Sequence, residues 1–83
     1  MRMEDIGKDV CRRLHHNIGG TTTDIGEGKC KVETEEVTIV IMPNGSAEIR
    51  PKKDPYVKIA LKYAKELRKV YEELGIKPKK EKQ

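Results

Sequence analysis

The first element predicted from the apolar pattern is a helix near the start of the chain. Over residues 3–18, apolar side chains recur at every fourth position: Ile6, Val10, Leu14 and Ile18. This spacing places one narrow apolar stripe on a helix, which the Gly19-Gly20 pair is expected to end. Residues 19–28 are rich in Gly and Thr and show no apolar periodicity, so they are predicted to form a flexible loop.

A β-hairpin is predicted next. Residues 37–42 are β-branched almost throughout, which is typical of a strand. The Asn44-Gly45 pair predicts a two-residue loop, because both residues tolerate the positive φ of a type I′ turn. This register places Met42 opposite Ala47. Residues 30–34 form either a third strand or an extension of the first.

The first strand of this hairpin is apolar on both faces, whereas its partner is apolar on one. We therefore expect the second face to be covered by the first helix or by another subunit. Because the chain has no Trp and no Phe, its core is thin, and self-association is a natural remedy. The sequence predicts a homodimer or higher homo-oligomer whose interface contains Val37, Ile39 and Ile41.

A long helix is predicted after the hairpin. Asp54 suits the N-cap, Pro55 the first helical position and Gly75 the position after the last turn. One broad apolar arc contains Tyr56, Ile59, Ala60, Tyr63, Ala64, Leu67, Val70, Tyr71 and Leu74. On the opposite side lie Lys58, Lys62, Lys65 and Lys69.

The predicted fold is therefore α+β, in the order α-β-β(-β)-α, with a small antiparallel sheet and a β-hairpin packed on the long C-terminal helix. Residues 1–76 form one small domain. Residues 77–83 are expected to be a disordered Lys-rich tail.

Composition narrows the protein class. The 83 residues contain no apolar run of the ~18 residues that a membrane span needs and no signal-peptide pattern, which predicts a cytoplasmic protein without a membrane role. In that setting Cys11 and Cys30 are expected to be free thiols. Asn and Gln together number three beside thirteen Lys, a weak indication of thermophile origin.

Charge is unevenly distributed. The formal net charge is +4, but residues 1–49 carry −3 and residues 50–83 carry +7. This asymmetry predicts contact between nucleic acid, DNA or RNA, and a basic surface made of Lys52, Lys53, Lys58, Lys62, Lys65 and Lys69. Because these residues are all lysines, base-specific contacts are not favoured. The alternatives are a lysine face that serves only solubility, and a structural or protein-interaction homo-oligomer with no nucleic-acid role.

Catalytic and metal sites find little support. No Ser/His/Asp or Cys/His arrangement indicates an enzyme, and no cofactor is implied. Cys11 and His15 lie four residues apart on the first helix, and Cys30 could approach them, which makes a weak candidate zinc set. The alternative assigns Cys11 to the apolar stripe, so we expect no metal.

Residues 43–78 combine an Asp54-Pro55 helix start, a helix with Ala64 and Leu67, and an exit over residues 73–78. These features, at this spacing, resemble the C-terminal segment of small terminase subunits of tailed phages. The resemblance implies a phage-related oligomer that acts with DNA in packaging. The family's usual Asn and Thr are replaced by Asp54 and Lys77, and its upstream helix-turn-helix is absent. The resemblance therefore supports an oligomerising helix more than DNA recognition.

Overall fold

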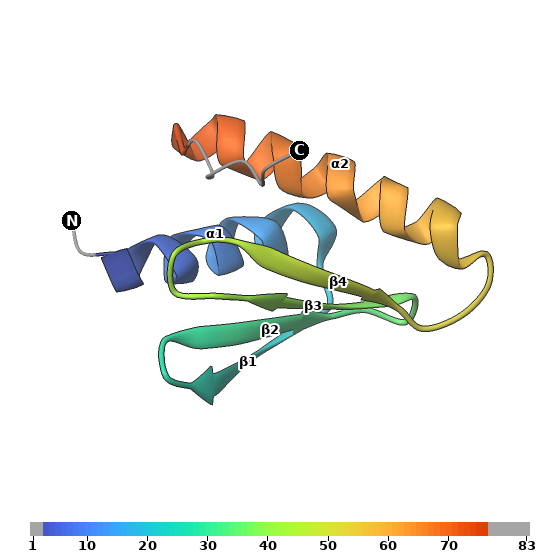
Figure 1. Cartoon of the computed structure of the whole chain (residues 1–83), viewed down its shortest axis with the longest axis horizontal. Helices are drawn as coiled ribbons and strands as arrows, with labels where there is room; N and C mark the ends of the chain where they lie inside the picture. Colours follow the sequence, from blue (N-terminus) through green and yellow to red (C-terminus); the bar gives the residue numbers. More distant parts are fainter. Residues whose placement is uncertain (1–2, 77–83) are drawn as a thin grey trace, which may run out of the picture.

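The computed structural model describes residues 3–76, and the predicted tail at residues 77–83 lies outside this range. Along the chain, one helix precedes the four strands and one follows them (Figure 1). In chain order they are α1 (Met3–Ile18), β1 (Thr21–Gly26), β2 (Lys29–Glu33), β3 (Val37–Ile41), β4 (Ala47–Pro51) and α2 (Tyr56–Leu74).

The molecule has two layers. The strands form one antiparallel sheet in the order β1-β2-β3-β4, and both helices lie on the same face of it (Figure 1). α1 packs mainly on β2, α2 packs on β4, and the helices contact each other. The other face is open and largely polar; it presents residues such as Lys31, Glu33, Thr38, Glu48 and Arg50. The α+β prediction is confirmed.

β1 is a strand that the apolar pattern did not reveal. Residues 21–26 were predicted to be loop, yet they pair antiparallel with β2. Every side chain of β1 is exposed, so the strand needs no apolar alternation and shows none. Its turn has positive φ at Glu27 (57°) and Gly28 (78°), as in a two-residue type I′ hairpin. Residues 29–33 are a separate strand, which settles the alternative left open for residues 30–34.

The β3–β4 hairpin differs from the predicted register by one residue. Ile41, not Met42, lies opposite Ala47. A two-residue loop would require Pro43 to donate a ladder hydrogen bond, and proline has no N–H. The chain instead forms a three-residue loop in which the Met42 N–H donates to the Ser46 carbonyl and the Gly45 N–H donates to the Met42 carbonyl.

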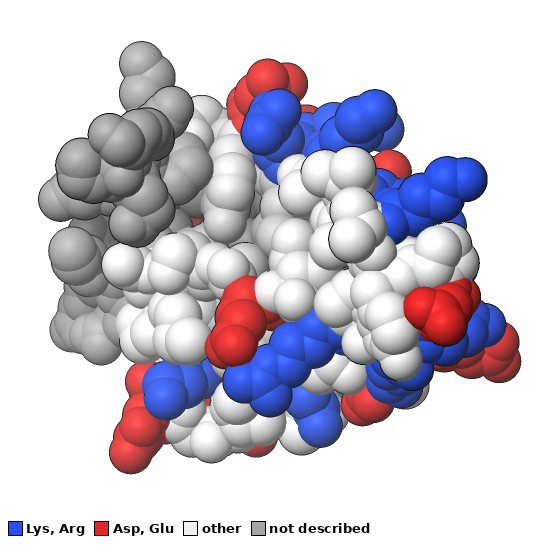
Figure 2. Space-filling model, turned by 45° about the vertical axis from the view of Figure 1, so that its right-hand side comes forward, with Lys and Arg blue, Asp and Glu red and all other residues white. Residues whose placement is uncertain are grey.

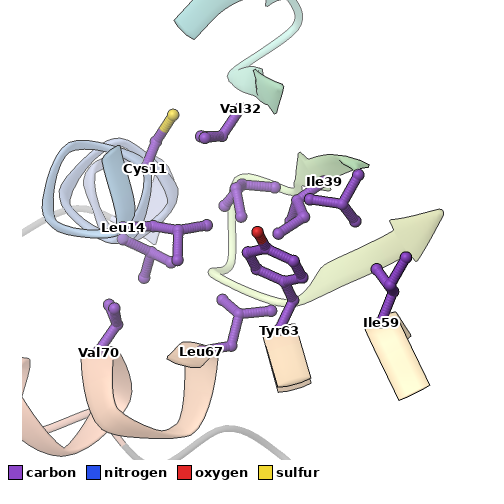
Figure 3. Packing of buried hydrophobic residues seen from close by; sticks show 11 residues of the cluster. Cys11, Leu14, Val32, Ile39, Ile59, Tyr63, Leu67 and Val70 are labelled. Carbon is purple, nitrogen blue, oxygen red and sulfur yellow. The ribbon is translucent and has the colours of Figure 1, made fainter. Parts of the chain in front are cut away.

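This shift places Ile39 and Ile41 on the same face of the sheet as Ile49 and Ala47, the face that the helices cover, because side chains alternate along a strand. Val37, Ile39 and Ile41 have no exposed surface and belong to the core. Figure 3 shows Ile39 beside Tyr63, in the cluster between the sheet and both helices that also contains Leu14 and Leu67. The prediction that Val37, Ile39 and Ile41 form an oligomer interface is wrong, since the chain's own helices cover them.

α2 follows its prediction at one end more closely than at the other. At the C-terminal end Gly75 has φ 70°, its N–H donates to Glu72, and the Ile76 N–H donates to Tyr71, which together form a Schellman motif. At the N-terminal end the N-cap is Pro55, and no side chain caps the helix. The predicted capping role of Asp54 is therefore wrong.

Candidate nucleic-acid interface

The lysines of α2 lie on its solvent side. Ile59, Tyr63, Leu67 and Val70 are buried against the sheet and α1, and this fixes the rotation of the helix. Opposite them, the exposed side of the helix carries Lys58, Lys62, Lys65 and Lys69, which we call the lysine row. The spacing of three or four residues keeps these side chains on one side.

Three of the six lysines predicted to bind nucleic acid form ion pairs within the chain. Lys62 lies 3.1 Å from Glu36, and Lys69 lies 3.7 Å from Glu66. Lys52 contacts Glu33 at 2.7 Å and so is held toward the open face of the sheet. Among the described side chains of residues 6–76, the other three form no ion pair: Lys53, Lys58 and Lys65.

Glu36, between β2 and β3, anchors the N-terminal half of the lysine row. Its carboxylate accepts a hydrogen bond from the Tyr63 hydroxyl at 2.7 Å and one from Lys62. These two contacts hold the pKa of Glu36 below its ordinary value, and the hydrogen bond to Glu36 raises the pKa of Lys62. A shallow hollow beside Glu36 is also lined by Lys53 and Lys58. Three lysines therefore lie around one hollow at the start of α2, together with the carboxylates of Glu36 and Asp54.

Acidic side chains separate the lysine row from α1. Glu73 accepts hydrogen bonds from Arg13 at 2.9 Å and Asn17 at 3.1 Å, which lower its pKa, Asn17 contributing the most. Glu66 lies one helical turn from Lys62 and pairs with Lys69. The row is therefore a bounded strip on α2 and is not continuous with the basic residues of α1.

The candidate zinc residues are placed together, but two of them are bonded to each other. Cys11 and Cys30 form a disulfide that joins α1 to β2, so the prediction of free thiols is wrong. Their sulfurs are not available as thiolate ligands. His15 lines the hollow beside the disulfide. Among the described residues, no group of three His, Cys, Asp or Glu side chains is arranged to hold a metal ion.

The disulfide also bears on the predicted compartment. Disulfides persist in oxidising compartments and in the intracellular proteins of hyperthermophiles. The free-thiol prediction followed from the cytoplasmic prediction, and the disulfide does not fit an ordinary cytoplasmic setting. No helix within residues 3–76 is long and apolar enough to cross a membrane.

A second surface feature, which the sequence analysis missed, lies on α2 beside the lysine row. Val57 is 73% exposed and Leu61 60%, and Tyr56, predicted to be buried, is 53% exposed. We call these three residues, with the half-buried Ala60 and Ala64, the apolar flank. Figure 2 shows an uncharged area between mainly basic atoms above and a mixed row of acidic and basic atoms below. The signal was present in the sequence, because Val57, Leu61 and Ala64 have helical spacing.

Comparison with known proteins gives no relative: no family model, no curated protein and no solved structure matches the chain. The resemblance to small terminase subunits therefore stays a prediction. α1 continues into β1, so a helix-turn-helix is not formed by residues 3–26.

Proposed function

We propose that this protein is a small, non-enzymatic accessory protein that binds nucleic acid without sequence specificity through α2. The observation that carries the proposal is the lysine row, four exposed lysines on one side of a rigid helix. From Lys58 to Lys69 the row extends about 16 Å, at 1.5 Å per residue. This length matches several successive phosphates of one strand.

The charge pattern within the row agrees with backbone binding. Lys58 and Lys65 form no ion pair within the described part of the chain, and Lys53 lies beside the start of the helix. The lysine side chains of these two pairs are more than half exposed, and their carboxylate partners are partly buried. Ion pairs at a protein surface contribute little energy, so phosphate can compete for Lys62 and Lys69. Lysine neutralises phosphate as a point charge and does not read base edges in bidentate fashion.

A salt titration tests this function. Fluorescence anisotropy with a labelled 20-base-pair duplex and a 20-nucleotide single strand measures the binding constant from low to physiological salt. If four or five lysines displace counterions from the duplex, log K falls with log salt at a slope of about −4 to −5. Scrambling the sequence leaves the affinity unchanged.

Matched double variants locate the site. We expect Lys58→Gln with Lys65→Gln to reduce the slope by about 2, because two phosphate contacts are lost. Lys29→Gln with Lys31→Gln removes the same charge from β2 and leaves the slope unchanged. Absence of binding at low salt, or equal effects of the two double variants, would show that α2 does not bind nucleic acid.

A further inference from the structure

β4 leaves backbone hydrogen-bonding groups unpaired. The bond from the Met42 N–H to the Ser46 carbonyl fixes the alternation of the β3–β4 ladder, so Glu48 and Arg50 bond to β3. Ala47 and Ile49 must then direct their N–H and C=O groups away from β3. In the described part of the chain β4 is the last strand of the sheet, and no strand pairs with these groups. Such an edge is a template for another strand.

The apolar flank of α2 lies above this same edge. On one side of α2, Glu73 bonds to α1 through Arg13. On the other side, the Tyr71 hydroxyl donates to the Gly45 carbonyl in the β3–β4 turn at 2.7 Å. At 100° per residue, Val57 and Leu61 fall on the side away from α1. A free strand edge and an exposed apolar helix flank therefore lie on the same side of the molecule, away from α1.

The charges on β4 are complementary to those of a second β4. Glu48 and Arg50 both lie on the open face of the sheet, about half and two-thirds exposed, and pair with each other at 2.9 Å. If two copies of β4 pair antiparallel about Ile49, Glu48 of each lies opposite Arg50 of the other. Opposite charges at facing positions stabilise a strand pair, and like charges destabilise it. Pro51 lacks an N–H, but its carbonyl can accept from Ala47 of the second copy.

The other edge of the sheet lacks these features. The β1–β2 register shifts between Asp24 and Gly26, and such bulges discourage pairing. No helix flank lies beyond β1, because α1 packs mainly on β2. The two edges are therefore not equivalent, and β4 is the edge suited to a partner strand.

We propose that this chain forms a symmetric dimer in which β4 pairs antiparallel with β4 of a second copy, joining the sheets into one of eight strands. The apolar flanks of both α2 helices then face the two-fold axis. Such an interface is isologous, since each copy contributes the same surface. The dimer does not depend on the proposed function, but it places two lysine rows on one side of the molecule.

Sedimentation velocity over a range of protein concentrations tests the dimer. The expected mass is about 19 kDa, twice the 9.5 kDa of the chain. Glu48→Arg and Arg50→Glu each place like charges across the axis, and each weakens dimerisation by about tenfold. Mixing the two variants restores dimerisation, because all facing charges are then opposite. The mixture separates this effect from the pair within one chain, which both variants break.

A variant on α2 tests the flank separately. Leu61→Glu is expected to abolish the dimer, whereas Lys8→Glu, at an exposed position of α1 away from β4, leaves it intact. Circular dichroism verifies that both variants fold. The proposal is overturned if the protein is monomeric at every concentration, if the dimer is insensitive to the Glu48 and Leu61 variants, or if the mixture of charge variants remains monomeric.

Discussion

Replacing Gly7 of α1 by alanine has two opposite effects on stability, because alanine favours the helix but its methyl group does not fit the packing. Alanine is favoured over glycine in a helix interior by about 1 kcal/mol, so the sequence alone predicts that Gly7→Ala stabilises the protein. In the structure a Cβ at this position would lie 2.3 Å from the Met42 carbonyl oxygen and 3.0 Å from the Cα of Pro43. Both neighbours are backbone atoms, which cannot rotate away.

The close approach of Gly7 to the β3–β4 turn allows a hydrogen bond between α1 and this turn. The Gly7 N–H donates to the Pro43 carbonyl at 2.9 Å, and Gly45 in the same turn packs under Ile6. An ordinary C···O contact is about 3.3 Å, so α1 must move by roughly 1 Å to accept the methyl group. Overpacking costs about 1–3 kcal/mol, and a weakened buried hydrogen bond costs about 1–3 kcal/mol. After the gain in propensity is subtracted, we expect a loss of about 1–5 kcal/mol.

Urea unfolding followed by circular dichroism, with the disulfide intact, measures the change. The matched control compares Lys8→Ala with Lys8→Gly at the exposed neighbouring position, where alanine should be favoured by about 1 kcal/mol. If Gly7→Ala raises the free energy of unfolding as the control does, the contact between α1 and the β3–β4 turn is not as tight as the structure indicates.

Two further predictions concern the disulfide and Glu36. The disulfide joins cysteines that are 19 residues apart in the sequence. Its reduction, or the double Cys→Ser variant, should therefore lower the free energy of unfolding by about 3 kcal/mol. Urea titrations with and without a thiol reductant measure this change, and equal midpoints would contradict it. Because Tyr63 and Lys62 lower the pKa of Glu36 in the folded state, its contribution is fully present above its ordinary value of 4.5 and is lost as the pH falls through the folded pKa. In an NMR titration, we expect Tyr63→Phe to raise the pKa of Glu36, and an unchanged pKa would contradict the hydrogen bond. We expect Glu36→Gln to reduce the loss of folding stability between pH 7 and pH 3.

The elements that bury an apolar stripe were predictable from the sequence. Residues 3–18 form the predicted helix, and Gly75 ends α2 as predicted, because both features follow from local spacing and backbone conformation. β1 was missed because an edge strand with every side chain exposed needs no apolar alternation. Its β-branched residues 21–23 and the Gly-rich turn after them were the available signal.

The hairpin register shows how one residue redirects a functional prediction. Asn44-Gly45 alone favours a two-residue loop, but Pro43 before it cannot donate the closing hydrogen bond. The resulting shift of one residue turns Ile39 and Ile41 toward the helices and removes the predicted interface. The disulfide was missed for a different reason, since a rule about compartments outweighed the prediction that Cys11 and Cys30 approach each other.

The two faces proposed for α2 follow from one property of the helix. The sheet and α1 cover only one side of α2, where Ile59, Tyr63 and Leu67 are buried. The rest of the helix surface is exposed along two strips. One strip is cationic and the other is apolar, and water is a poor environment for the second. A second copy would remove the apolar strip from water and leave the lysines accessible. Loss of self-association in Leu61→Gln, which adds no charge beside the lysine row, with an unchanged salt slope of nucleic-acid binding per chain would separate these two roles.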